Sequence, residues 1–227
     1  MRSLCKKGLM GFAGAALLAG GLPAQGGDLL SVDFTTVGNL SIQALQERFQ
    51  VQIDNYLGPP NEATKFKCLR LGGNPEGVPS LRFPFGKKVP KGSLKIALGT
   101  SNSYSDARIK LLSGPKELLR LTVNPKELQL ATGEQVKYPA DVATVNRANK
   151  ENRLVATFAW NVRPGDAKGT VSCSLAQPEK HGDAAVNVVK EEQFAVYGVP
   201  DTLLIELPAH DISSRNIEIF QINVTED

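Results

Sequence analysis

The sequence of 227 residues lacks an excess of charge of either sign. Its 26 basic residues face 23 acidic ones, and three of the basic residues, Arg2, Lys6 and Lys7, lie at the very start. Without those three, basic and acidic residues are equal in number. A protein that binds the backbone of nucleic acids needs surplus Lys and Arg to displace counterions. We therefore expect no nucleic acid among its partners.

Long hydrophobic runs are also missing. The uncharged run at residues 8–22 is rich in Gly and Ala and is shorter than the roughly 20 apolar residues that span a bilayer. A basic start precedes this run and Pro23-Ala24 follows it, which is the pattern of a secretory signal. We predict a signal peptide at residues 1–24 and, because no linker or repeat interrupts the rest, a single domain at residues 25–227. The mature chain should be secreted or periplasmic, without a membrane span.

Cysteine and histidine are scarce, with three Cys and two His in the chain. Cys5 belongs to the predicted leader, so the mature chain keeps Cys68 and Cys173. In an oxidising compartment these two could form one disulfide, which would stabilise the fold by about 4–5 kcal/mol in the chain-entropy model. They could equally be two separately buried thiols. His181 and His210 are not paired in sequence with these cysteines as zinc ligands usually are, so we predict no metal site.

Short segments of alternating apolar residues dominate the remainder, and Gly, Pro, Asn or Ser separates them. Alternation with a period of two is typical of strands that bury one face. We therefore predict strands at residues 29–36, 65–71, 80–85, 93–99, 107–113, 117–123, 126–131, 152–162, 169–176, 192–199, 201–208 and 215–224.

Residues 41–56 hold the one helical pattern. Ile42 and Leu45 begin an apolar series at helical spacing behind Ser41, a residue type that caps helices. Residues 49–53 instead alternate between apolar and polar, as a strand does. We predict a helical turn that leads into a strand.

Many antiparallel strands without crossover helices must bury one face of each sheet against another sheet. This predicts an all-β fold, an antiparallel two-sheet jelly-roll sandwich. The segments follow one another as an opening strand ending in Asp33-Phe34, a Leu-Arg-Leu-Gly-Gly strand at 69–73, adjacent apolar strands at 107–113 and 117–123, and a final strand with Asn216-Ile217-Glu218-Ile219. This succession resembles the concanavalin A-like lectin/glucanase jelly roll, including its laminin-G-like relatives.

The resemblance implies that the first and last strands are neighbours, with residues 30–34 beside residues 217–224. Within the last strand the apolar phase changes between Ile219 and Phe220. A β-bulge at this point would let both halves face the core.

Motifs for catalysis are missing from the sequence. Polysaccharide hydrolases that resemble this fold carry their carboxylates on a Glu-x-Asp-x-x-Glu strand, and no such run occurs. No Gly-x-Ser-x-Gly nucleophile motif occurs either. We lean towards a protein that is not an enzyme, although a groove assembled from distant strands would leave no local trace.

Features suited to sugar binding are fainter but present. A sugar ring has an apolar face ringed by hydroxyl groups, so it suits an aromatic ring beside polar side chains. The best such set in the sequence is Tyr104 with Asn102, Asp106 and Arg108. We predict that this loop contacts a ligand.

Alternation places three further side chains. Arg82 and Asn161 fall on the more polar side of their strands, and they would line a ligand-binding face if that side is concave. Trp160 shares its phase with Phe158, so we expect it in the core.

We therefore predict a secreted, non-catalytic module that binds a polysaccharide or another glycan, a function implied mostly by the fold resemblance. One alternative is an extracellular structural or protein-interaction sandwich without a sugar site. Another is a polysaccharide-active hydrolase or lyase with a non-local site. We expect no cofactor.

Overall fold

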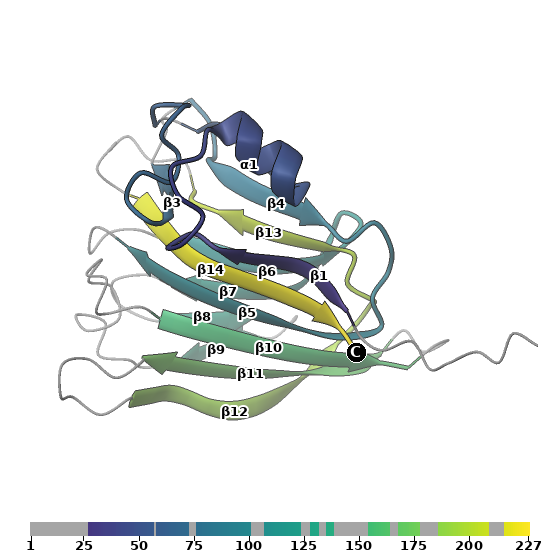
Figure 1. The fold of residues 1–227 in the computed structure, drawn as a ribbon. Coiled ribbons are helices and arrows are strands. Elements are labelled where there is room, and N and C mark those ends of the chain that lie inside the picture. Colours follow the sequence, from purple (N-terminus) through teal and green to yellow (C-terminus); the bar gives the residue numbers. More distant parts are fainter. Residues whose placement is uncertain are drawn as a thin grey trace, which may run out of the picture.

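The computed structural model describes residues 27–56, 58–72, 76–100, 107–123, 128–131, 135–138, 154–163, 168–177, 186–208 and 216–227. In these residues the strands form two seven-stranded antiparallel sheets, one in front of the other in Figure 1. The predicted fold class, an antiparallel two-sheet sandwich, is confirmed. The proposed signal peptide at residues 1–24 lies outside the described residues and stays a prediction.

We call the sheet at the front of Figure 1 sheet A. In the order of hydrogen-bonded neighbours, its strands are β1 (Asp28–Asp33), β14 (Asn216–Glu226), β5 (Lys91–Thr100), β10 (Leu154–Val162), β11 (Gly169–Gln177) and β12 (Val186–Val196), and β3 (Leu69–Gly72) also pairs with β14.

Sheet B lies behind it. In the same order, its strands are β2 (Gln52–Asp54), β4 (Ser80–Pro84), β13 (Thr202–Glu206), β6 (Ala107–Ser113), β7 (Lys116–Val123), β8 (Leu128–Ala131) and β9 (Gln135–Tyr138). Strand β9 had not been predicted from the sequence.

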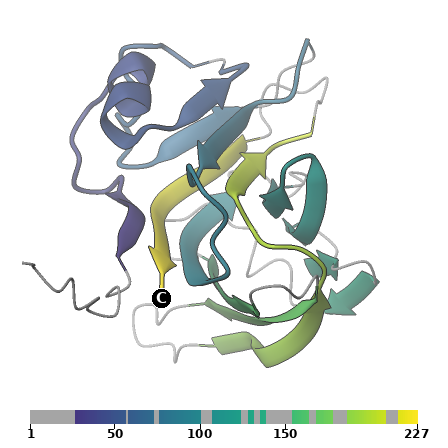
Figure 2. The ribbon, with the colours of Figure 1, turned by 90° about the vertical axis from the view of Figure 1, so that its right-hand side faces the viewer.

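The helix α1 (Ile42–Phe49) leads directly into β2, as the mixed pattern predicted. The Ser41 hydroxyl caps it by accepting a hydrogen bond from the Ala44 N–H at 3.1 Å. Gln50, in a left-handed conformation (φ 53°), then ends the helix. Figure 2 shows α1 at the top of the sandwich, beside the blue strands of sheet B. Leu45 is the buried residue of the helix, and the partly buried Ile42 and Phe49 also pack against the core.

The core between the sheets shows why alternation was informative. On β10, the buried side chains are Leu154, Ala156, Phe158, Trp160 and Val162, whereas the residues between them are at least partly exposed. Trp160 is only 2% exposed and its ring stacks on Phe85, with the ring centroids 6.4 Å apart. The prediction that Trp160 belongs to the core is confirmed.

Strand β14, the last strand, lies between β5 and the first strand, β1. It pairs with β1 on one side, and the Phe34 N–H donates a hydrogen bond to the Phe220 carbonyl oxygen at 2.9 Å. Its register against β5 shifts between Ile219 and Gln221. Phe220 lies at this bulge and packs in a separate small cluster with Cys68 and Ala97. The predicted neighbours and the predicted bulge are both confirmed.

Candidate functional site

The predicted ligand loop is not described in full. Asn102, Tyr104 and Asp106 lie outside the described residues, so their contact with a ligand stays a prediction. Of that set the structure places Arg108, on β6.

Arg82 and Arg108 lie on the outer face of sheet B. They are on β4 and β6, the two strands that flank β13. In the strand registers, Arg82 lies opposite Leu204 and Arg108 lies opposite Glu206. One Arg108 guanidinium nitrogen is 3.8 Å from the Glu206 carboxylate. These two predicted residues therefore share a face.

That face carries its own charge network. The Lys110 ammonium lies 2.5 Å from Glu206 and 3.4 Å from Glu117, and Arg120 lies 3.5 Å from Glu117. Lys110 and Arg120 are direct cross-strand partners, and Glu117, which contacts both, offsets the repulsion between these two like charges. The described charges on this face largely satisfy one another.

Asn161 lies on the other side of the sandwich, which corrects the expectation that it shares a face with Arg82. It is exposed on the outer face of sheet A, between the buried neighbours Trp160 and Val162. Alternation had shown which side of its own strand Asn161 occupies. It could not show that β10 and β4 belong to different sheets, because the outer faces of the two sheets point in opposite directions.

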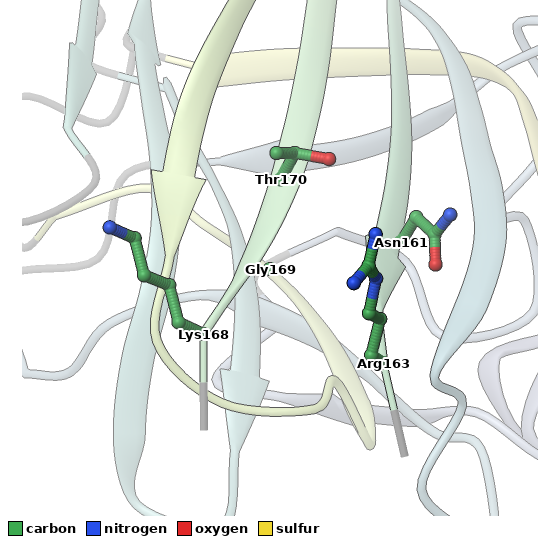
Figure 3. Close-up of a pocket in the computed structure, with 5 residues that line it drawn as sticks. All are labelled: Asn161, Arg163, Lys168, Gly169 and Thr170. Carbon is green, nitrogen blue, oxygen red and sulfur yellow. The ribbon is translucent and has the colours of Figure 1, made fainter. Parts of the chain in front are cut away.

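Asn161 instead lines a hollow at the end of the β10–β11 hairpin, which we call the hairpin hollow (Figure 3). It has a volume of about 330 Å³ and is lined by Asn161, Arg163, Lys168, Gly169 and Thr170. Asn161 and Thr170 are direct cross-strand partners on the exposed face. Figure 3 shows the Arg163 side chain rising beside Asn161, with Lys168 on the opposite arm of the hairpin.

Gly169 makes this hairpin tight. A Cβ atom on Gly169 would lie 2.5 Å from the Asn161 carbonyl oxygen and 2.7 Å from a Val162 methyl carbon. Real Cβ atoms do not approach so closely, so a larger residue would force the two strand ends apart. Because Gly169 has no side chain, the two strand ends can lie close enough for Asn161 and Thr170 to be neighbours.

The lining of the hairpin hollow is rich in hydrogen-bond donors. Arg163, Lys168, Asn161 and Thr170 contribute a guanidinium, an ammonium, a carboxamide and a hydroxyl group, and none of the described lining residues carries a carboxylate. The Lys168 ammonium also lies 5.9 Å from the ring centre of Tyr197, which is 49% exposed. Such a hollow suits a ligand with acceptor oxygens or negative charge.

Arg163 and Lys168 were not identified from the sequence. They flank Pro164-Gly165-Asp166-Ala167, a segment whose Pro and Gly indicate only a break between the predicted strands at 152–162 and 169–176. The available signal was their position at the two ends of a predicted hairpin, since residues at such positions meet across the hairpin.

The two cysteines are not joined, so the disulfide alternative is wrong and the alternative of two separately buried thiols holds. Cys68 immediately precedes β3, and four strand-to-strand steps separate β3 from Cys173 on β11. At about 4.8 Å per step this is roughly 19 Å, whereas a disulfide needs Cα atoms within about 7 Å. Burial raises the pKa of the Cys173 thiol to about 12.

The described residues include neither a candidate metal site nor a membrane-spanning helix. They contain no group of three or more His, Cys, Asp or Glu side chains placed to hold a metal ion. In the same part of the chain, no helix has the length and apolar character needed to cross a membrane.

The architecture defines the class of fold: this chain is a concanavalin A-like jelly roll. No protein-family model matches its sequence, and no curated protein matches it.

Solved structures do resemble it. A legume lectin-like domain from Entamoeba histolytica aligns with a TM-score of 0.53 at 9% identity, covering 88% of this chain and 98% of that one. The Crh5 transglycosylase in complex with NAG aligns with a TM-score of 0.54 at 12% identity, covering 86% and 83%. The CBM2 module of the evolved Dit protein of Lactobacillus casei BL23 phage J-1 aligns with a TM-score of 0.54 at 10% identity, covering 88% and 95%. At these identities the likeness establishes the fold.

Proposed function

We propose that this protein is a non-catalytic glycan-binding module and that the hairpin hollow is a contact site for an acidic glycan. The observation that carries the proposal is the donor-rich lining, in which Arg163, Lys168, Asn161 and Thr170 surround an open hollow. Uronate and sulfate groups supply the acceptor oxygens that guanidinium and ammonium groups bind best. The lectin-like domain and the carbohydrate-binding module among the similar structures support the choice of glycan as ligand.

The proposal includes a place of action outside the cytoplasm. It rests on the leader pattern of residues 1–24, which predicts cleavage after Ala24. N-terminal sequencing of the secreted protein should find Gln25 or a residue next to it. Recovery of a chain that still begins with Met1 would contradict this part of the proposal.

The binding proposal is tested with an array of immobilised polysaccharides, both neutral ones and acidic ones such as polygalacturonate and alginate. We expect the wild-type protein to bind acidic members and to release them as salt rises, since salt screens exposed charges. The double variant Arg163→Gln/Lys168→Gln should weaken this binding about tenfold, because it removes two exposed contacts that each contribute about 1 kcal/mol or less to the binding free energy.

A charge-matched control comes from Lys95, which is exposed on sheet A but does not line the hollow. Lys95→Gln removes one positive charge, as the single variants Arg163→Gln and Lys168→Gln each do, and should leave binding within twofold of wild type. Equal losses from Lys95→Gln and from either hollow variant would indicate attraction to net charge rather than a site. Binding to no glycan at all would favour the alternative of a protein-interaction sandwich.

One observation supports an enzyme as the second candidate. Glu117 and Glu206 both contact the Lys110 ammonium on the outer face of sheet B, so two carboxylates lie close together there. Glycosidases use such a pair, but the glycosidic bond must lie between the carboxylates. Here the ammonium occupies that place. Reducing-sugar release on the polysaccharides of the array, abolished by Glu206→Gln, would establish the enzyme instead.

A further inference from the structure

A second hollow lies far from the hairpin, between the segment of residues 56–66 and strand β3. It has a volume of about 570 Å³, and we call it the β3 hollow. The lining residues that matter here are Tyr56, Pro59, Phe66, Arg70, Gly72 and Asn216. Asn216 is at the start of β14, whereas the strand registers place the hairpin hollow beside the end of β14. At roughly 3.3 Å per residue, the length of this strand separates the two hollows by about 30 Å. The two hollows are therefore separate.

The floor of the β3 hollow holds an unmet hydrogen-bond acceptor. The Asn216 side chain is at the floor, the residue is only 8% exposed, and its Oδ1 atom has no hydrogen-bond partner among the described residues. Its cross-strand partner is Gly72, which has no side chain to cover it. Buried acceptors without a partner are rare because they lose hydration without compensation. A ligand that donates a hydrogen bond would satisfy this one.

The wall of the hollow holds an unmet donor. Arg70 and Glu218 are direct cross-strand partners and form an ion pair, which holds the guanidinium in place. The Arg70 Nε atom is nevertheless buried without a hydrogen-bond acceptor. In the register, Arg70 and Asn216 are diagonal neighbours, a relationship that separates side chains by about 7–8 Å. A molecule with several hydroxyl groups can donate to one and accept from the other.

The rim of the hollow is aromatic. The Phe66 ring is 56% exposed, and the Arg70 guanidinium lies 4.8 Å from its centre. Tyr56 lines the same space, and burial raises the pKa of its hydroxyl above the ordinary value of 10.0. Exposed apolar rings beside polar groups are what the C–H face of a sugar ring packs against.

Among the described residues, the charges around the hollow are already balanced. Glu218 neutralises Arg70, and Glu62 pairs with Lys65 at 2.8 Å. A charged ligand would have to compete with these pairs, whereas an uncharged one would not.

We propose that the β3 hollow binds a single uncharged pyranose ring, stacked on Phe66 and hydrogen-bonded to Asn216 and Arg70. The inference goes beyond the proposed function, because it concerns a different site and a neutral ligand. It would hold even if the hairpin hollow bound nothing.

The test uses the full protein and saturation-transfer-difference NMR with methyl glucoside, methyl galactoside, methyl mannoside and N-acetylglucosamine as probes. We expect at least one probe to bind with millimolar affinity and to receive saturation at its ring protons. Phe66→Ala should weaken that probe at least fivefold. Tyr197→Ala removes another exposed ring outside the hollow and should leave the affinity for that probe unchanged.

Two further variants separate binding from folding. A Cβ atom on Gly72 would meet nothing within 4 Å, so Gly72→Val should fold, and its side chain should cover Asn216 across the strand pair and abolish the signal. Asn216→Leu removes an acceptor that has no partner, so it should lose binding at least tenfold without lowering the melting temperature.

The proposal is overturned if no probe binds, or if a probe binds equally to wild type and to the Phe66→Ala, Gly72→Val and Asn216→Leu variants. Should either strand variant fail to fold, the comparison of Phe66→Ala with Tyr197→Ala decides alone. If the protein binds acidic polysaccharide but none of the four probes, this inference is refuted and the proposed function is not.

Discussion

The indole N–H of Trp160 donates a hydrogen bond to the carbonyl oxygen of Val89 at 2.8 Å, and both residues are buried. Val89 belongs to the turn before β5, whereas Trp160 lies near the end of β10. The bond therefore connects this turn to a core residue of sheet A. It also satisfies the one polar atom that the indole brings into an apolar environment.

Trp160→Ala should lower the free energy of unfolding by about 3–5 kcal/mol, because it empties a large core site. Trp160→Phe should cost less, about 1–3 kcal/mol, since it keeps a ring but leaves the Val89 oxygen without a partner. Urea denaturation measures both. Tyr197→Ala, at an exposed ring, is the control and should stay within about 0.5 kcal/mol of wild type. An unchanged Trp160→Ala variant would place Trp160 outside the core.

Once the proposed cleavage has removed Cys5, the protein should contain two titratable thiols after denaturation without reductant, from Cys68 and Cys173. Adding a reductant should not change its melting temperature, because no cross-link constrains the unfolded chain. Thiol titration and thermal unfolding in parallel check this. Finding no titratable thiol would show that the two sulfurs are bonded after all.

Cys173 should make the protein less stable at high pH. Burial raises the pKa of its thiol from 9.0 to about 12, so the folded state holds this proton while the unfolded state releases it. The free energy of unfolding should therefore fall as the pH rises above about 9, and this loss should be complete near 12. Cys173→Ala removes the effect. The difference between wild type and variant isolates it from the titration of Tyr and Lys.

Gly169→Ala should destabilise the protein by about 1–3 kcal/mol, because the new methyl group would collide with the backbone of Asn161. Gly72→Ala is the matched control. Its methyl group would meet nothing within 4 Å, and it should be neutral or stabilise by up to about 1 kcal/mol. Equal melting temperatures for the two variants would contradict the close approach at the hairpin.

Local pattern was sufficient for much of the fold. The alternation on β10 predicted that Trp160 is buried and Asn161 exposed, since neighbouring side chains on a strand must point to opposite faces. The change of phase at Ile219–Phe220 predicted the bulge for the same reason. Strand β9 was missed although Val136 and Tyr138 alternate with Gln135 and Lys137, because an alternation of four residues is too short to distinguish a strand from a loop.

The sites depended on strand pairing, which alternation does not encode. The sequence by itself determined the class of fold, which residues are buried in each clearly alternating strand, and the side of β10 on which Asn161 lies. Only the tertiary structure decided that Asn161 and Arg82 face opposite directions. It also brought Arg70 beside Glu218, a residue 148 positions away, and Asn216 opposite Gly72. The physical reason is that a side chain's face is set by its own backbone, whereas its neighbours are set by which distant strand the sheet places next to it.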